Sequence, residues 1–520
     1  MRYYFFYMLL SLTLTLNSQG FRVRHYLQNT STNLSKAIFE TTPGNYITGG
    51  ITVETINNIS CNRLCIMGLN AQGQITWTKK YGNDKFEYLT NNLTTRSFYK
   101  QGNYIYFVGC VRDSLNKQIG VLIKFNSSGD TLWQKTYRDS DPLEDVIPQM
   151  VTGSVDGGFL ITGFFQNSGN SPYRKCMVIK TDVNGTELWR QKIAKLTPNT
   201  QDGKAIVQDA LSKKIVIVGY QYIGNANSWG NYESVLILDS LGTKLSQHNY
   251  AGYGGVLFDL IQTQDGKFVA AGIAIYPQTL GGYNLNKSYI VKFDVNSPSN
   301  PIWMINNFDR LSLTNAFHSL VELTNGEILV GGVLDTLQVN NMNTNSFVRL
   351  TKFSSSGAVT WNKNYDYKVN SPTSDNVLAV RSINLTSDGS WIAALESFNF
   401  PSPNPFFFVK FDSTGCDSTL AYCQSQVISG VYQTTLNDVS VEVFPNPVTD
   451  YLTVNIPVGI ATEDTWSLKI RDLTGRELKT MRLIDETNIL DMNGLPEGIY
   501  LLVISKNGSP AYTMKLVKQE

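Results

Sequence analysis

The stretch from Asp156 to Lys192 decides the fold: it reads DGGFLITG at 156–163, a connecting segment, and then MVIKTDVNGTELWRQK at 177–192. Three short runs are rich in β-branched and aromatic residues; an Asp-Gly-Gly turn sequence precedes the first run, and a Val-Asn-Gly turn sequence separates the second from the third. Gly and Asn readily adopt the positive φ angles that tight hairpin turns require. The stretch therefore predicts consecutive antiparallel strands.

The same unit recurs along the chain at a nearly constant spacing. It is marked by one position near the start of its last strand, occupied by Trp77, Trp133, Trp189, Ser246, Trp303, Trp361 and Thr419. Four residues before these marks stand Gly73, Gly129, Gly185, Gly242, Gly357 and Gly415, and residues 296–301 replace the glycine of the fifth copy. Successive marks are 56, 56, 57, 57, 58 and 58 residues apart. So regular a period indicates a repeat architecture.

Each unit supplies four strands, which in the first copy are expected at 36–41, 45–52, 63–70 and 74–81. Residues 21–26 resemble the last strand of a unit, and the seventh copy lacks a convincing last strand. Pairing the two would close a ring and leave no sheet edge open. The sequence therefore predicts an all-β fold, a seven-bladed β-propeller of four-stranded antiparallel blades over residues 21–423. The residues expected to pack between blades are Trp77, Trp133, Trp189, Trp303 and Trp361.

The N-terminus predicts export. Arg2 is followed by an uncharged, mainly apolar run over 3–16 and by Ser18-Gln19-Gly20, a small-x-small pattern suited to signal peptidase. The run is shorter than the roughly 20 residues that span a bilayer. Residues 1–20 are therefore expected to be a cleaved signal peptide, with no transmembrane anchor afterwards. A net charge of +1 with 16% charged residues gives no case for binding nucleic acid.

A second domain is expected at the C-terminus. Residues 424–440 are polar and lack periodicity, which is typical of a linker. Residues 441–520 contain short, evenly spaced strand patterns separated by turns at 474–475 and 496–498. About 80 residues of this kind predict a small Ig-like β-sandwich.

Two family resemblances accompany these patterns. The units resemble the β-propeller repeats of large secreted bacterial proteins, in which DGGFLITG and K-x-D-x-x-G-x-x-x-W strings recur; the fourth unit departs from the pattern at Ile237 and Ser246. Residues 441–520 resemble the type A C-terminal sorting domain of the type IX secretion system. This second resemblance rests on Pro445, Asn446, Pro447, Asp472, Gly475, Gly498, Tyr500 and Lys515.

The sorting-domain resemblance implies a route and a partner. It implies passage through the inner membrane, folding in the periplasm and export across the outer membrane by the type IX machinery. The domain is then commonly removed, which leaves the protein either released or attached to the cell surface.

Little in the sequence points to catalysis or a cofactor. The chain holds only His25, His248 and His318, and no His, Cys and carboxylate cluster has metal-ligand spacing, so neither a metal nor a cofactor is expected. The string at 182–185 could pass for half a calcium loop, but its counterparts occupy hairpin turns, where Asx side chains cap the backbone. Paired carboxylates for glycoside cleavage stay open, because the fold sets their separation.

The six cysteines suggest one structural bridge. Cys416 and Cys423 lie seven positions apart after the last predicted blade, and a disulfide there would pin the ring where it closes. Cys61 and Cys65 are a weaker candidate pair, because four positions along one strand would separate them widely. Cys110 and Cys176 are expected to be buried thiols.

The propeller topology predicts two unlike faces. The short turns between first and second and between third and fourth strands share one face, here called the turn face; longer segments at 164–175, 220–233, 273–287 and 333–346 share the other, the loop face. Aromatic rings beside amides suit sugars or peptides, although such rings can also merely cover the ends of the blades. The candidate binding residues are Tyr173, Tyr222, Trp229, Tyr232, Tyr276 and Tyr283.

These features support three functions for an exported propeller. The first is a non-catalytic binding or adhesion module with a glycan or surface-protein ligand. The alternatives are a polysaccharide-active hydrolase or lyase that works from carboxylates or tyrosines over the central channel, and a structural surface protein.

Overall fold

The computed structural model describes residues 20–56, 59–82, 87–89, 96–112, 117–167, 174–193, 200–225, 228–250, 254–280, 283–307, 312–337, 344–367, 377–398, 404–417, 442–456, 465–472, 476–485, 487–506 and 509–519. The chain divides into two compact units that part near residue 425. The predicted signal peptide, except for Gly20, and the predicted linker lie outside the described residues.

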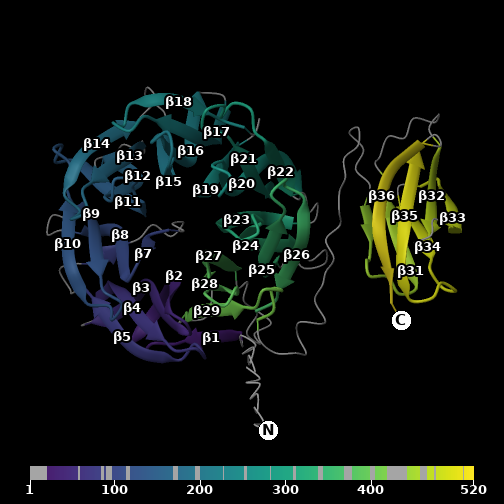
Figure 1. Cartoon of the computed structure of the whole chain (residues 1–520), viewed down its shortest axis with the longest axis horizontal. Coiled ribbons are helices and arrows are strands. Elements are labelled where there is room, and N and C mark those ends of the chain that lie inside the picture. Colours follow the sequence, from purple (N-terminus) through teal and green to yellow (C-terminus); the bar gives the residue numbers. More distant parts are fainter. Residues whose placement is uncertain are drawn as a thin grey trace, which may run out of the picture. The chain divides into compact units, whose positions relative to one another are not determined.

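The first unit is a ring of seven blades, each an antiparallel sheet whose first strand faces the centre (Figure 1). Blade 1 contains β2 (Thr30–Thr42), β3 (Asn45–Ile56), β4 (Ile59–Leu69) and β5 (Ile75–Tyr81). Blade 2 contains β6 (Tyr88–Leu89), β7 (Phe98–Gln101), β8 (Tyr104–Arg112), β9 (Gln118–Phe125) and β10 (Thr131–Tyr137). Blade 3 contains β11 (Glu144–Gly153), β12 (Phe159–Asn167), β13 (Arg174–Thr181) and β14 (Glu187–Ile193).

The remaining blades follow the same order. Blade 4 contains β15 (Thr200–Gln208), β16 (Ile215–Asn225), β17 (Ser228–Leu238) and β18 (Lys244–His248). Blade 5 contains β19 (Gly254–Gln262), β20 (Phe268–Leu280), β21 (Tyr283–Phe293) and β22 (Trp303–Asn307). Blade 6 contains β23 (Ser312–Glu322), β24 (Ile328–Leu337), β25 (Thr344–Phe353) and β26 (Val359–Tyr365). Blade 7 contains β27 (Val377–Leu385), β28 (Trp391–Phe398) and β29 (Phe406–Phe411), with β1 (Phe21–His25) as its outer strand.

The N-terminal strand closes the ring. β1 pairs antiparallel with β29, from Phe21 opposite Lys410 to His25 opposite Phe406. The pair Phe21 and Lys410 matches Trp189 and Lys180 in blade 3, so Phe21 holds the seventh position of the tryptophan series. Thr419, which the sequence period assigned to that position, lies outside the described residues.

The blade-ending tryptophans lie against the turn glycines of the following blade. A Cβ atom added to Gly129, Gly185 or Gly242 would come within 2.7, 2.9 or 2.8 Å of the ring of Trp77, Trp133 or Trp189, respectively. These glycines have φ near +80°, a conformation that favours glycine. One residue type therefore satisfies both the turn and the close approach of the indole.

The segments that the sequence assigned to long loops are largely strand. β16 and β17 remain paired from Tyr220 opposite Glu233 out to Asn225 opposite Ser228, and β20 and β21 remain paired out to Leu280 opposite Tyr283. Prediction of loops there was wrong because a hairpin ladder is held by backbone hydrogen bonds and can continue through Asn- and Gly-rich sequence.

The C-terminal unit is a sandwich of two sheets. One holds β30 (Glu442–Phe444), β31 (Tyr451–Asn455) and β34 (Thr487–Asp491); the other holds β33 (Glu477–Leu483), β32 (Trp466–Arg471), β35 (Gly498–Lys506) and β36 (Ser509–Lys518). Residues from both sheets share one core that includes Leu452, Leu468 and Leu502. The predicted all-β class, seven-bladed propeller and small sandwich are confirmed.

Candidate functional site

The repeated Lys and Asp of the sequence motif form an ion pair inside the blade. Nζ of Lys292 lies 2.6 Å from Oδ2 of Asp265, and Lys180 pairs in the same way with Asp156. The lysine comes from the third strand and the aspartate from the first turn. The DGG and K-x-D strings therefore stabilise the blade at its turn face.

The Asx residues of the second turn accept backbone hydrogen bonds. The amides of Asn184 and Thr186 donate to Oδ1 of Asp182 at 2.9 and 2.7 Å. Among the described residues, no group of three or more His, Cys, Asp and Glu side chains could hold a metal ion. The turn interpretation of residues 182–185 is therefore supported by its geometry.

A β-bulge recurs in the first strand of six blades, the strand nearest the central channel. The pairing register skips one residue there, and the skipped residues are Lys36, Gln149, Lys204, Phe258, His318 and Arg381. Blade 2 has an interrupted first strand instead, and Arg96 lies in the interruption before β7. A bulge turns a side chain out of the regular alternation, so one side chain from each blade converges on the channel.

The bulges of blades 3 and 4 share one buried carboxylate. Asp202 accepts hydrogen bonds from Nε2 of Gln149 at 2.8 Å, from Nζ of Lys204 at 3.1 Å and from Nη1 of Arg174 at 3.1 Å. Burial lowers the pKa of Lys204, and the charge of Asp202 opposes that effect. The carboxylate is completely buried, and its cationic partners neutralise its charge.

Blades 1 and 7 share a second carboxylate. Nζ of Lys36 lies 2.6 Å and Nε of Arg381 lies 3.2 Å from Oε2 of Glu396. The side chains are fully or almost fully buried. This cluster ties the first blade to the last on their inner strands, whereas β1 closes the ring at the outer edge of blade 7.

A third ion pair crosses the channel from blade 2. Nε of Arg96 lies 2.7 Å from Oδ1 of Asp259 in blade 5, and its Nη2 donates to the carbonyl of Leu320 in blade 6 at 2.8 Å. The amides of Leu260 and Leu320 also donate to Asp259 at 2.9 Å. Burial raises the pKa of Asp259, while Arg96 and the two amides act against that rise.

His318, the bulge residue of blade 6, packs against an aromatic ring of blade 5. The rings of His318 and Phe258 have centroids 4.9 Å apart. Burial, with a smaller effect of the Arg381 charge, holds the pKa of His318 well below its ordinary value. His318 is therefore neutral at physiological pH.

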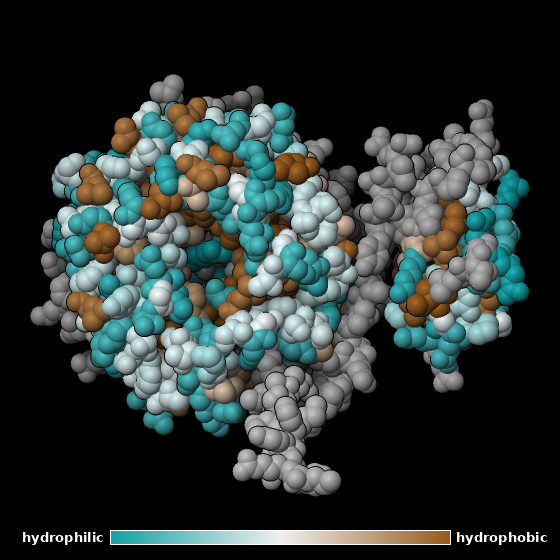
Figure 2. Space-filling view, in the orientation of Figure 1, coloured by the Kyte–Doolittle hydropathy of each residue, from teal (hydrophilic) through white to brown (hydrophobic). Residues whose placement is uncertain are grey.

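The visible face of the propeller has a central hollow with hydrophilic residues deep inside it (Figure 2). Of the described carboxylates, the three bonded to bulge residues or to Arg96, namely Asp202, Glu396 and Asp259, are held by cations or amides. A general acid needs a proton, and a nucleophile or base needs a carboxylate that substrate can reach. Three buried, ion-paired carboxylates meet neither need.

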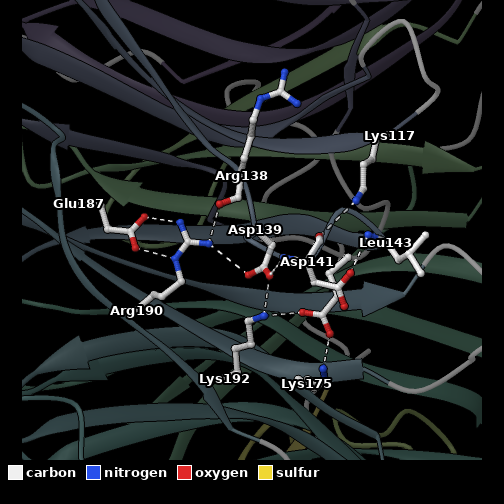
Figure 3. A network of polar contacts seen from close by, with 10 residues as sticks. Lys117, Arg138, Asp139, Asp141, Leu143, Lys175, Glu187, Arg190 and Lys192 are labelled. Carbon is white, nitrogen blue, oxygen red and sulfur yellow. Dashed lines mark hydrogen bonds and ion pairs between the residues drawn. The ribbon is translucent and has the colours of Figure 1, made fainter.

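A further charged network ties blade 2 to blade 3 on the loop face (Figure 3). Asp139 accepts from Lys192 at 2.7 Å and from Arg190 at 3.3 Å; Glu144 accepts from Lys192 at 2.7 Å and also from Lys175. Positive and negative groups alternate through this network, so its charges neutralise one another.

The structure partly places the six candidate aromatic residues. Tyr222 and Tyr232 are half-buried on the β16–β17 hairpin. Because Gln221 pairs with Tyr232, the neighbouring Tyr222 lies on the other side of the sheet, and the two rings do not form one platform. Tyr173 and the side chains of Trp229, Tyr276 and Tyr283 lie outside the described part of the chain.

The cysteines show one correction. Cys61 and Cys65 are buried and do not form a disulfide, and the same holds for Cys110 and Cys176. Four residues along β4 span about 13 Å, well beyond the roughly 7 Å that a disulfide bridges between Cα atoms. Cys416 is disulfide-bonded, and Cys423 lies outside the described residues.

Several sorting-motif residues hold the sandwich together. Asn446 donates from Nδ2 to the carbonyl of Lys515 at 2.8 Å and accepts from the amide of Val517 at 2.8 Å. Tyr500 donates to the carbonyl of Pro496 at 2.5 Å, and Asp472 accepts from the amide of Arg476 at 3.1 Å. The peptide bonds before Pro445 and Pro447 are cis, Gly498 begins β35, and Gly475 lies outside the described residues.

Sequence reasoning missed the channel residues and the network of Figure 3. The bulge residues are chemically unlike one another from blade to blade, so the repeat gave no signal for them. Lys292 and Asp265 were visible as motif letters, and a search for an aspartate 22 to 27 positions before each repeated lysine could have paired them.

The family comparison concerns the C-terminal unit. Residues 442–519 match the family described as the secretion system C-terminal sorting domain. A search of curated proteins finds no match to the chain. No helix among the described residues is both long and apolar enough to cross a membrane.

Solved structures resemble the chain only distantly. They include a protein of unknown function from Dyadobacter fermentans, at 11% identity over 64% of this chain and 95% of that chain, with a TM-score of 0.39. The WD40 domain of SCAP from fission yeast has 10% identity over 75% and 97%, with a TM-score of 0.34. The GH32 β-fructofuranosidase of Bombyx mori has 9% identity over 75% and 91%, with a TM-score of 0.30. At such scores the propeller assignment depends on the strand pairing described above. The C-terminal unit is a type IX secretion system sorting domain, and the chain is a secreted β-propeller protein that carries it.

Proposed function

We propose that the propeller is a non-catalytic binding or adhesion module that its sorting domain delivers to the cell surface. Its ligand is a glycan or a surface protein, bound on the loop face. The observation that carries the proposal is the state of the channel carboxylates: Asp202, Asp259 and Glu396 are completely buried and ion-paired. A site of this kind favours a rigid scaffold over a reaction centre.

The loop face supplies the surface for a ligand. The hairpins of blades 4, 5 and 6 stay paired out to Asn225 opposite Ser228, Leu280 opposite Tyr283 and Leu337 opposite Thr344. In blade 3 the corresponding ladder stops at Gln166 opposite Arg174, close to the body of the ring. The hairpins of blades 4, 5 and 6 thus extend beyond that of blade 3, as does the hairpin of blade 1, which stays paired out to Ile56 opposite Ile59. Binding residues on ordered strands are held more rigidly than on loops.

The delivery step is part of the proposal. Residues 1–20 act as a signal peptide for the inner membrane, the chain folds in the periplasm, and the type IX machinery recognises residues 442–519. Fractionation of the producing cells, with antibodies against each unit, tests this route. Deletion of 442–519 should trap the propeller in the periplasm, and surface delivery without those residues would contradict the route.

The binding proposal is tested with the purified full-length chain. It is screened against polysaccharides and surface proteins, and both binding and product release are recorded. Saturable binding without turnover that weakens in Tyr222→Ala and Tyr232→Ala supports the proposal. The control is Leu211→Ala, which removes a large side chain, 87% exposed, from the turn face of the same blade.

The other outcomes overturn the proposal. Product release would establish a hydrolase or lyase, and the channel carboxylates would then be the first residues to substitute. Absence of both binding and turnover would favour a structural surface protein.

A further inference from the structure

A cavity of about 290 Å³ lies between blades 1 and 2 at the turn face. The indole of Trp77 lines it together with hydroxyl and amide side chains; Tyr46 also borders it, but its ring is buried against Phe21 of blade 7. These polar residues include Thr42, Asn45, Thr76 and Asn103, all of them exposed to solvent. No lining residue is charged.

The cavity exists because blade 1 lacks the lysine of the repeat. Gly68 is opposite Trp77 in blade 1, whereas Lys180 is opposite Trp189 in blade 3 and Lys292 is opposite Trp303 in blade 5. In blade 2 the equivalent Lys124 lies over the ring of Tyr104, with Nζ 3.8 Å from the ring centroid.

The partner of that lysine is also missing. In blades 3 and 5 the lysine pairs with Asp156 or Asp265 of the first turn, and in blade 7 Lys410 pairs with Asp388 at 2.6 Å. The first turn of blade 1 is a hairpin that ends with Thr42 opposite Asn45. Thus both side chains of the ion pair are replaced by smaller, uncharged groups.

The indole of Trp77 lies directly against Gly68. A Cβ atom on Gly68 would lie 2.2 Å from Nε1 of Trp77, so no side chain fits there while the indole keeps its position. The indole therefore borders the cavity at the place where other blades carry the lysine stem.

We propose that this cavity binds one ring of a neutral sugar. An aromatic ring stacks on the apolar face of a pyranose, and hydroxyl and amide groups satisfy the sugar hydroxyls. The absence of charged lining groups disfavours acidic sugars, phosphates and peptides with charged termini. The volume is at the lower end of the usual range for ligand pockets, which suits a single ring. The site is on the turn face, so it is separate from the proposed loop-face function.

The test uses the full-length chain labelled with ¹⁵N at its tryptophan indoles. Methyl α-D-glucopyranoside, methyl β-D-galactopyranoside and N-acetylglucosamine are titrated while the indole signals are recorded. We expect at least one sugar to shift the Trp77 signal saturably, with a dissociation constant on the order of millimolar for so small a ligand. Trp77→Phe identifies that signal and should abolish the saturable response. Asn103→Ala should weaken binding about fivefold to tenfold through loss of one hydrogen bond.

The matched control is Trp133→Phe at the junction of blades 2 and 3. Trp133 contacts Gly185 as Trp77 contacts Gly129, but its opposite residue is Lys124. This variant should keep sugar binding unchanged.

A lack of any saturable shift, or equal loss of binding in the two tryptophan variants, would overturn the proposal. Circular dichroism checks that each variant folds. If Trp77→Phe fails to fold, Asn103→Ala still decides the question, because it changes only an exposed turn residue. Loop-face binding that is unchanged in Trp77→Phe would show that the two sites are independent of each other.

Discussion

The hydroxyl of Tyr137 donates a 2.8 Å hydrogen bond to the carbonyl oxygen of Gly185, the turn glycine of the following blade. Tyr365 makes the same bond to Gly415 at 2.5 Å, and Tyr81 makes it to Gly129. At the ring closure Nε2 of His25 lies 2.8 Å from the carbonyl of Gly73. Each of these outer strands is therefore fixed to the next blade by a polar contact as well as by an aromatic ring.

Tyr137→Phe should lower the free energy of unfolding by about 1 kcal/mol, because it leaves the carbonyl of Gly185 without this donor. Tyr137 is only 3% exposed, so water replaces the bond poorly. Urea unfolding followed by fluorescence measures the change. The control is Tyr26→Phe, because Tyr26 is 52% exposed. Equal losses in the two variants would contradict a role for the contact.

Gly185→Ala should destabilise the protein more than Gly266→Ala. Both glycines have a φ of +75°, so both alanines carry a similar backbone penalty of about 1 kcal/mol. A Cβ atom at Gly185 also meets the ring of Trp133 at 2.9 Å, whereas none lies within 4 Å at Gly266. Overpacking should add roughly 1 to 3 kcal/mol at Gly185 alone. Thermal unfolding of the two variants measures the difference, and identical losses would show that the indole yields freely.

The sequence predicted the ring because its period is carried by residues with strict geometric duties. The glycine at position 185 must take a positive φ and leave room for an indole, so few alternatives are tolerated and the pattern repeats. From the sequence, residues 21–26 could be recognised only as a fragment of a last strand. The pairing of Phe21 with Lys410 shows that Phe21 occupies the tryptophan position of blade 7.

The candidate site was less predictable, because its backbone geometry does not restrict the residue type. Lys36, Gln149 and Phe258 share a backbone feature, a bulge, that several residue types can occupy. Their partners come from other blades, so neither spacing nor composition links Arg96 with Asp259. The extended hairpins were also missed, because Asn- and Gly-rich strands look like loops.

Asp156→Asn should make the free energy of unfolding less dependent on pH between about 4 and 2. Partial burial alone would raise the pKa of Asp156, but hydrogen bonds from Lys180, Ser154 and the amide of Gly158 lower it to about 2. A depressed carboxylate pKa stabilises the fold above its ordinary value of 3.8, and that contribution is lost as the pH falls toward 2. The side chain is 59% exposed, so solvent screening keeps the effect below about 1 kcal/mol.

Unfolding measured in urea across this pH range checks the prediction. The free energy of unfolding of the wild type should exceed that of Asp156→Asn above the ordinary pKa, and this difference should disappear as the pH falls to the lowered pKa. Lys180→Met should remove the same pH-dependent component, because it removes the hydrogen-bond donor. A constant difference at all pH values would contradict the assignment to this pair.

Arg96→Met should destabilise the ring strongly at neutral pH, by roughly 3 kcal/mol, because it leaves the carboxylate of Asp259 buried without its cation. The loss should shrink as the pH falls. Burial raises the pKa of Asp259 in the folded state, and Arg96 acts against that rise. Removing the cation therefore raises the pKa further, and the folded state then takes up a proton more readily than the unfolded state. Protonation relieves the penalty of the buried charge.

Urea unfolding at neutral pH and at about pH 5 measures this dependence. Combining Arg96→Met with Asp259→Asn should recover much of the stability, because the second substitution removes the unpaired charge and keeps an oxygen to accept from the amides of Leu260 and Leu320. A loss that is the same at both pH values and additive in the double variant would mean that Arg96 acts through packing alone. A coupled, pH-dependent loss would establish that the interruption in blade 2 has an electrostatic role: it brings a cation across the channel to the carboxylate of blade 5.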